Sequence, residues 1–548
     1  MPSTKGDHSS LNSNSITCVD TNSNDLKFDP EAQIIADQIK VPLSKVELIM
    51  VMIGLSLGVF LSALDQTIVS TALPKIASEF NSLDQISWVA TSYLLTMTAL
   101  QPTYGKFSDI FGRKETLLFA IIIFEIGSLL CGLAPNMVSL IIFRAIAGIG
   151  GSGIINLVII IISDIVSLQD RGKYQGMIAG VFGIASVVGP LLGGAFTDHL
   201  TWRWAFYINI PIGGVTIVAI IFLLHMPRPK GSLLQKLKRI DYMGTIFMIL
   251  TIVAFLLPLS WGGNEYAWNS PVVIVLLVVG FIGCLIFALI EVKFSVEPIA
   301  PPHLFKNVNV IGNFGTNFFQ GMAFYGLVYY IPVYFQVIKG DSATASGLEL
   351  IPYILGVVIA SISTGQFISR SDIASYRTII IMGSVLITVG SGLLTLWNEH
   401  SGRGVQIGYM IITGVGVGII IQTTILCGQQ IVDYKDVASV TSLLTFFRTI
   451  GAVFGVAVIG TTFKDVLARN LNKLSLPTEI NLAVRQSAFA VQSLPDDMRI
   501  PVISAYVNAL SVAYMVLVPA GILCTICATF VGNHKPRRSE KETVVVFD

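Results

Sequence analysis

Three charged side chains interrupt long apolar stretches of the sequence, and the two carboxylates among them can take up and release a proton. Asp65, Glu125 and Arg144 each lie within an apolar run long enough to cross a membrane. A charge at such a depth is costly unless it is paired, neutralised or beside water. Asp65 and Arg144 lie at similar depths, roughly 8–10 Å below the outer surface at about 1.5 Å per residue. We therefore expect Asp65 to be the proton-coupling site, Arg144 to tune it, and Glu125 to relay protons or pair with a neighbour. A static buried pair of Asp65 and Arg144 is the alternative.

A row of uncharged polar side chains marks a second candidate site. Asn313, Asn317, Gln320 and Phe324 follow one another at spacings of four, three and four residues, which places them on one face of a helix. Hydrogen-bonding groups beside aromatic rings suit large amphipathic ligands. We expect these residues, together with Arg448 from a later apolar span, to line a substrate cavity. The alternative is that the row forms hydrogen bonds between helices and that Arg448 is a buried pairing residue.

The composition indicates that a lipid bilayer surrounds these residues. The chain has 548 residues, of which 53% are hydrophobic and 12% charged, and its mean hydropathy is +0.75. A soluble protein carries about 25% charged residues. A net charge of +1 in such a chain does not favour a nucleic-acid partner. The sequence has no phosphate-binding loop, no catalytic triad motif and no His/Cys metal cluster. We expect no enzyme activity, no cofactor and no metal, and a proton gradient rather than ATP as the energy source.

The apolar stretches predict an all-α polytopic membrane protein with fourteen spans, divided as six, two and six. Lys and Arg are concentrated in the loops on the side of the N-terminus, which places both termini in the cytoplasm. The predicted organisation is a disordered cytoplasmic tail 1–46, a six-helix bundle 47–225, a basic cytoplasmic loop with inserted helices 226–305, a second six-helix bundle 306–531 with a long outer loop 464–505, and a cytoplasmic tail 532–548.

The loop between the second and third spans combines turn-forming and charged residues. Gly105 and Gly112 allow the chain to turn, and Asp109, Arg113 and Lys114 place charges where the apolar stretch stops. The stretch resembles the signature loop of the major facilitator superfamily. In that family the aspartate and the basic residues latch helix ends together and gate the alternation between inward-open and outward-open forms. The alternative is a cationic anchor at the membrane surface without a gating role.

Two further stretches resemble motifs of the fourteen-spanner drug:proton antiporters of that superfamily. Leu64–Pro74 is similar to their first-helix motif, although Ser70 stands where the family usually has Asn. Arg144–Gly153 resembles the motif of the fourth helix, whose arginine is implicated in proton transfer. Ala147 stands where the family often has Gln.

A run of glycines in the fifth span resembles the motif that is associated with exporters rather than importers. Gly183, Gly189, Pro190, Gly193 and Gly194 match it. Glycines at helical spacing form a groove for close helix packing, and proline bends a helix, so packing alone is the alternative explanation.

The resemblance implies a major facilitator fold of two six-helix bundles and two extra helices. It also implies a monomeric, proton-coupled exporter of small, largely apolar compounds, with the plasma membrane as the expected location and the vacuolar membrane as the alternative. Two other functions stay open. One is a vacuolar carrier that exchanges basic amino acids for protons, and the other is a non-transporting nutrient sensor on the same fold.

Overall fold

The computed structural model describes residues 44–82, 85–263, 266–370, 375–474, 476–486 and 488–533. Contacts divide the chain into residues 1–41 and 42–548, and all the helices named below belong to the second unit. The predicted tail 1–46 lies outside the described residues up to residue 43, and α2 already begins at Lys45. The predicted tail 532–548 lies outside them from residue 534 onward.

The first half of this unit is a bundle of helices whose starts are set by polar caps. The Ser44 hydroxyl accepts a hydrogen bond from the Glu47 amide, and Asn136 and Ser167 cap α5 and α6 in the same way. Gly112, with φ +109°, separates α3 from α4. The helices are α2 (Lys45–Glu79), α3 (Ile86–Phe111), α4 (Arg113–Leu133), α5 (Met137–Ile165), α6 (Leu168–His199), α7 (Trp204–Tyr207) and α8 (Asn209–Leu223).

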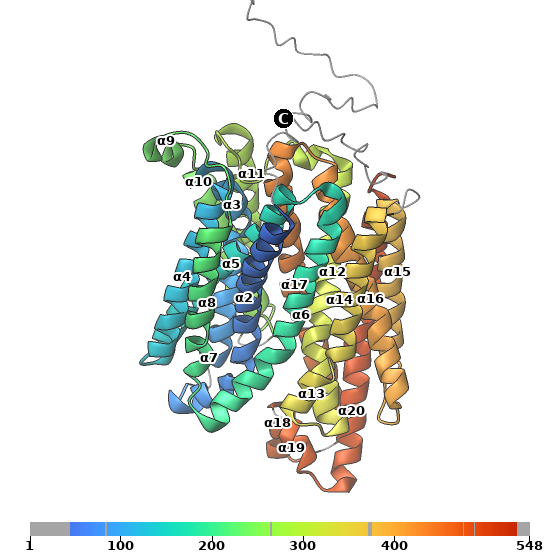
Figure 1. The fold of residues 1–548 in the computed structure, drawn as a ribbon. Coiled ribbons are helices and arrows are strands. Elements are labelled where there is room, and N and C mark those ends of the chain that lie inside the picture. The colour runs from blue at the N-terminus through green and yellow to red at the C-terminus, as the bar shows by residue number, and fades with distance from the viewer. Residues whose placement is uncertain are drawn as a thin grey trace, which may run out of the picture. The chain divides into compact units, whose positions relative to one another are not determined.

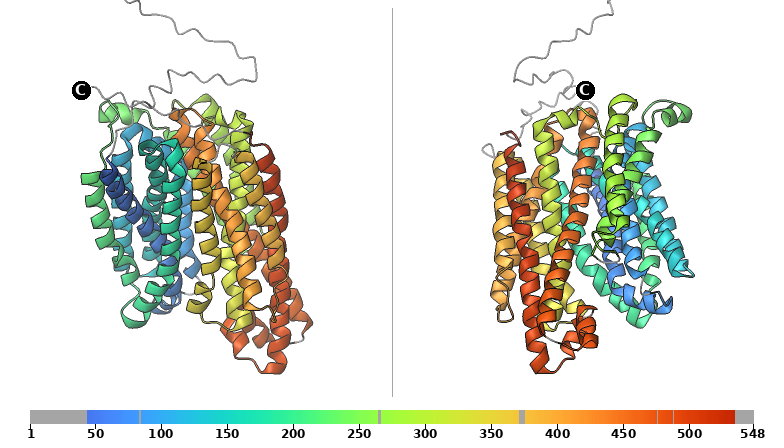
Figure 2. Two further views of the ribbon diagram at one scale, coloured as in Figure 1. Left: turned by 45° about the vertical axis from the view of Figure 1, so that its right-hand side comes forward. Right: turned by 180° about the vertical axis from the view of Figure 1, so that it is seen from behind.

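Three helices connect the two halves. The short α9 (Leu233–Lys238) belongs to the basic loop, and α10 (Tyr242–Trp261) and α11 (Pro271–Lys293) form an antiparallel pair. Seen from behind in Figure 2, α10 and α11 lie between the blue helices of the first half and the orange helices of the second. Helix α10 contacts both α3 and α17, so the inserted pair packs against both bundles.

The second half repeats the bundle and adds helices where a loop was expected. Much of the segment 464–505, which was predicted as a long outer loop, is helical, because α17 continues to Lys473 and two short helices precede α20. Leu467, Leu471, Val484 and Val502 of this segment are buried in the core of the second half, and that burial stabilises it as helix. The helices are α12 (Val308–Tyr334), α13 (Ala343–Leu348), α14 (Ile351–Arg370), α15 (Tyr376–Leu394), α16 (Arg403–Gln430), α17 (Val437–Lys473), α18 (Thr478–Gln486), α19 (Ala488–Gln492), α20 (Asp496–Met515) and α21 (Leu517–Thr529); η2 (Leu304–Lys306), η3 (Phe335–Lys339) and η4 (Tyr434–Asp436) are short turns of other helix types.

Thirteen helical segments of the described residues are long and apolar enough to cross a membrane. Helix α3, which occupies the second predicted span, is not among them because hydroxyl and amide side chains such as Thr96, Thr98 and Gln101 interrupt its apolar stretch. Each of the other predicted spans coincides with one of the thirteen. The prediction of an all-α polytopic membrane protein is confirmed.

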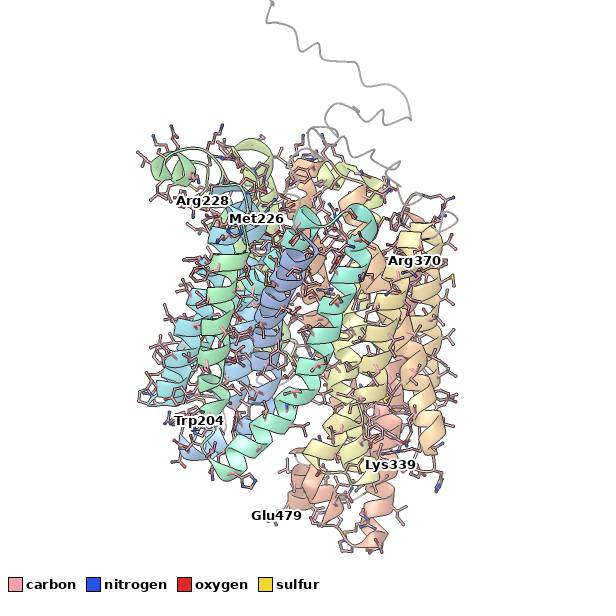
Figure 3. The ribbon with its side chains drawn as sticks, viewed as in Figure 1. Trp204, Met226, Arg228, Lys339, Arg370 and Glu479 are labelled. Atoms are coloured by element: carbon pink, nitrogen blue, oxygen red, sulfur yellow. The ribbon has the colours of Figure 1, made fainter. Side chains whose placement is uncertain are left out.

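The two ends of the helix bundle differ in their charges and loops. Arg228 and Arg370 lie at the end that carries the Gly112 turn, which we call the loop end (Figure 3). Trp204, Lys339 and Glu479 lie at the opposite end, which we call the far end, together with α7, α13 and α18 (Figures 1 and 3). The loop end is the one predicted to face the cytoplasm.

Candidate functional site

Asp65 and Arg144, which lie at similar depths, form a buried ion pair. Arg144 Nη1 donates to Asp65 Oδ2 at 2.6 Å, and the two side chains are 2% and 0% exposed. Asp65 comes from α2 and Arg144 from α5, so the pair joins two helices of the first half. Opposite charges removed from water this completely stabilise each other only if their remaining polar atoms are also bound.

Neighbouring side chains complete this environment. Asn209 Nδ2 donates to Asp65 Oδ1 at 3.1 Å and to Ser128 Oγ at 2.7 Å. The Arg144 guanidinium lies 4.3 Å from the centre of the Tyr93 ring, a cation–π geometry. Asn209 and Tyr93 were not predicted as site residues. Asn209 is a polar side chain in an apolar span, and that signal, which identified Asp65, could also have identified Asn209.

Glu125 lies near this pair but is not hydrogen-bonded to it. Both carboxylate oxygens are buried without a hydrogen-bond partner in the described part of the chain, and the carboxylate packs directly against Gly213 of α8. An ionised carboxylate in that position would be uncompensated. The structure therefore leaves the relay role of Glu125 as a prediction and shows no ion pair for it among the described residues.

The loop around Gly112 holds helix ends of both halves together. Arg113 Nη1 lies 2.5 Å from Asp109 Oδ1, and Arg113 Nε donates to Asp164 Oδ2 at 2.8 Å, at the end of α5. Tyr434, just before α17, donates to the other oxygen of Asp164 at 3.4 Å. This chain of contacts confirms that Asp109 and Arg113 bind neighbouring helix ends, whereas their gating role stays a prediction.

The glycines and the lysine of this loop have different roles. Only Gly112 makes the turn, and Lys114 Nζ donates to the Ile221 carbonyl at the end of α8 at 2.7 Å. The expectation that Gly105 turns the chain is wrong, because Gly105 lies inside α3. A Cβ at Gly105 would lie 3.0 Å from the carbonyl oxygen of Ala438 in α17 and even closer to the next turn of that helix. Gly105 therefore allows α3 and α17 to approach each other.

The glycines of the exporter-like motif lie on the contact faces of α6. Gly183 faces α14, whereas Gly189 and Gly193 face α2, and a Cβ at any of the three would meet an atom of the partner helix. Gly194 has no atom within 4 Å of an added Cβ, so it does not belong to this packing surface. Helix α6 continues through Pro190 to His199.

A second set of contacts closes the loop end between the halves. Gly172 of α6 and Gly365 of α14 bring two backbones together, since a Cβ on Gly172 would lie 2.5 Å from the Gly365 carbonyl oxygen. Beside them, Arg171 and Gln175 each donate to Gln429 Oε1 of α16 at 3.4 Å. The inner seal is our name for three contacts: the approach of Gly172 to Gly365, the hydrogen bonds of Arg171 and Gln175 to Gln429, and the approach of α3 to α17 at Gly105.

A cavity of about 350 Å³ lies between α2, α3, α10, α12 and α17. Tyr325, Tyr329 and Tyr330 of α12 line it, as do Gln66, next to Asp65, and residues of α17 from Thr449 to Lys464. On α17 these residues follow the stretch that contacts Gly105. The cavity therefore lies between the inner seal and the far end.

The predicted substrate-cavity residues do not line this cavity. Asn313 Nδ2 donates to the Thr424 carbonyl of α16 at 3.3 Å, and Asn317 Oδ1 accepts from the Thr424 hydroxyl at 3.3 Å. The polar row thus hydrogen-bonds to a neighbouring helix, which was the alternative. The amide of Gln320 is buried without a hydrogen-bond partner among the described residues.

The two remaining residues of that prediction lie beside the cavity rather than in its wall. Phe324 stacks on Tyr353 of α14, with ring centres 6.0 Å apart. Arg448 precedes the lining residue Thr449 and is close enough to Tyr325 for an electrostatic interaction. On α12, the tyrosines and not the predicted amides line this cavity.

Comparison with known proteins identifies the family. Residues 55–456 match the model of the Major Facilitator Superfamily. The MFS-type efflux pump MFS1 of Arthroderma benhamiae is 39% identical over 485 residues, covering 88% of this chain and 90% of the relative. The efflux pump roqT of Penicillium rubens is 37% identical over 496 residues, covering 89% and 91%.

Solved structures show the same fold. The proton:xylose symporter XylE gives a TM-score of 0.58 at 14% identity, over 90% of this chain and 98% of that one. The human organic anion transporter MFSD10 gives a TM-score of 0.58 at 11% identity, over 87% and 99%. Together with the signature loop, the family model and the efflux-pump relatives show that the chain belongs to the major facilitator superfamily.

Proposed function

We propose that the protein exports small, largely apolar compounds across a membrane in exchange for protons, by alternating access. The observation that carries the proposal is the buried pair of Asp65 and Arg144, which lies one residue from Gln66 in the cavity wall. Relatives with 37–39% identity over most of the chain are named efflux pumps, which supports export as the direction.

Membership in a transporter family confirms the prediction that the chain is not an enzyme. The predicted coupling by protons needs neither a cofactor nor a metal, and we propose that the chain works as a monomer. We also propose that both termini face the cytoplasm and that the plasma membrane is the location, with the vacuolar membrane as the alternative.

The inner seal is closed and the cavity lies beyond it, which fits the step of an alternating-access cycle in which the loop end is shut. With the loop end in the cytoplasm, this arrangement corresponds to a state in which the compound has left the cytoplasmic side. Gly172 and Gly365 must separate, and Arg171 and Gln175 must release Gln429, before the cavity can open inward.

Asp65 supplies the proton site in this scheme. A neighbouring positive charge favours the ionised form of a carboxylate, and its withdrawal in apolar surroundings favours the protonated form. Proton uptake by Asp65 from the far end would break the 2.6 Å ion pair with Arg144. The inward-open state would then release the proton when Arg144 pairs with Asp65 again, so that one proton enters for each cycle of export.

The cavity argues against the basic amino acid carrier. Among the described residues that line it, none is acidic, so a cationic substrate would find no carboxylate partner there. Helices of both halves line the cavity, as alternating access requires, so the cavity does not favour a non-transporting sensor.

The test is accumulation against a gradient. The purified full chain is reconstituted in proteoliposomes, a pH gradient is imposed, and uptake of a fluorescent lipophilic probe is followed with the gradient intact and after a protonophore. The proposal predicts accumulation that the protonophore abolishes. Equilibration of the probe without accumulation would contradict proton coupling, and no protein-dependent flux would contradict export itself.

A further inference from the structure

No acidic side chain lies among the described residues that line the cavity. The described lining residues are mostly apolar or carry hydroxyl groups, and the one charged side chain among them is the cation Lys464. The nearby Asp65 carboxylate is already bound by Arg144 and Asn209. A bound compound would therefore meet hydroxyl groups and aromatic rings in the described wall, but no available carboxylate.

A second cation lies at the inner end of this cavity. Arg448 precedes Ala452 and Val456 by one and two helical turns, and both of these line the cavity, so Arg448 lies at the edge of the lining face of α17. Its side chain is half-buried rather than enclosed, and it forms no ion pair with the described residues. An arginine in a membrane span usually faces the protein interior or a water-filled cavity and marks a candidate functional site.

The contacts of the two membrane arginines differ in a way that separates their roles. Arg144 is fully enclosed and bound to Asp65. Arg448 has as its electrostatic neighbour the phenol of Tyr325, which itself lines the cavity. A guanidinium offers a fork of donors that matches the two oxygens of a carboxylate or another oxyanion.

We propose that the cavity takes amphipathic organic anions, whose aromatic or apolar body lies against Tyr325 and Tyr329 and whose oxyanion binds Arg448. This inference rests on the proposed function and names the substrate class of the same cavity. Tyrosine rings and aliphatic walls favour a flat apolar body, whereas the arginine favours a negative group at one end. The inside-negative membrane potential would also assist the outward movement of an anion.

The test compares three probes that share one ring system. Naphthalene-1-acetate carries a negative charge, naphthalene-1-acetamide is neutral and 2-(1-naphthyl)ethylamine is a cation. Their binding to the purified full chain in detergent is measured by calorimetry at neutral pH, without a pH gradient. We expect the acid to bind about tenfold more tightly than the amide, and the amine most weakly.

Two variants assign the preference to a residue. Arg448→Gln should weaken binding of the acid about tenfold and leave the affinity for the amide within about twofold. Arg469→Gln, an exposed arginine farther along the same helix, is the matched control and should change neither affinity. The thermal midpoint of each variant shows whether the fold is retained, and the amide affinity reports the cavity independently of the charge.

The outcomes separate this inference from the proposed function. Equal affinity for the three probes, preference for the amine, or no detectable binding of the acid would overturn the assignment of an anionic substrate. Retention of the acid preference in Arg448→Gln would overturn the role of Arg448. Because binding is measured without a gradient, a failure of proton-driven accumulation would contradict the proposed function alone.

Discussion

The contact between Gly172 and Gly365 offers the sharpest perturbation of the inner seal. An added Cβ at Gly172 would lie 2.5 Å from the Gly365 carbonyl oxygen, 2.7 Å from its Cα and 2.8 Å from its carbonyl carbon. Ordinary contacts begin at 3.4 Å, so α6 and α14 must separate by up to 0.9 Å to accept a methyl group. The atoms in the way belong to a backbone that cannot rotate aside. Overpacking of this kind costs about 1–3 kcal/mol.

That cost falls on the state in which the seal is closed. A change of about 1–3 kcal/mol shifts a two-state equilibrium roughly 5- to 150-fold, so Gly172→Ala should populate the form that is open at the loop end. Spin labels are attached at Lys173→Cys and Arg377→Cys in a chain without its six native cysteines. Double electron–electron resonance then measures the distance between the two labels, which reports the separation of the halves. Gly172→Ala should add a population with a longer distance.

The same helix provides the control. Gly194→Ala adds the same methyl group where no atom lies within 4 Å, and it should leave both the distance distribution and the thermal midpoint unchanged. An unchanged distribution in Gly172→Ala would refute the reasoning, whether or not the thermal midpoint falls. In that case the close approach would stabilise the fold without distinguishing the two states.

Two other contacts give simpler predictions. Asp109→Asn removes one of the two carboxylate partners of Arg113. The loss of about 1 kcal/mol should change the transport rate about fivefold at unchanged protein abundance. An unaltered rate would remove the gating role of the loop. Tyr329→Ala should change the relative affinities for aromatic probes. Asn317→Ala should lower the thermal midpoint, because it removes a hydrogen bond between α12 and Thr424 of α16, and it should keep the order of affinities; the reverse result in binding assays would restore the amide row as the substrate site.

The sequence was sufficient for those features that depend on local pattern or on depth. Hydropathy located the spans because the free energy of transferring a segment from the hydrocarbon core to water depends only on its own residues, about 20 of them. The similar depths of Asp65 and Arg144 made a pair possible, but only the fold shows that α2 and α5 face each other.

Features that depend on how helices are rotated against one another were not predictable. Helix α12 carries amides on one face and tyrosines on another, and both faces are chemically suitable for a ligand. The structure turns Asn317 toward α16 and Tyr329 toward the cavity. Asn317 finds a hydrogen-bond partner on α16, and a single sequence does not show which neighbour a helix face meets.

The inserted helices and the glycines illustrate the same limit. Helix α10 was predicted as an addition to the two bundles, yet its residues Leu256 and Ser260 contribute to the cavity wall. Gly105 looked like a turn residue because it lies near a charged loop, whereas its conformation is helical and its function is close packing. A glycine serves both purposes, and only the positive φ of Gly112 tells them apart.

The central claim is that Asp65 couples proton entry to export, and proton-driven accumulation by Asp65→Asn tests it most directly. The variant is compared in proteoliposomes with the wild type and with Asp433→Asn, which alters an exposed carboxylate at the loop end. We predict that Asp65→Asn still exchanges substrate across the membrane but no longer accumulates it under a pH gradient, while Asp433→Asn behaves as the wild type. Accumulation by Asp65→Asn with unchanged proton stoichiometry would contradict the claim and make Glu125 the next candidate.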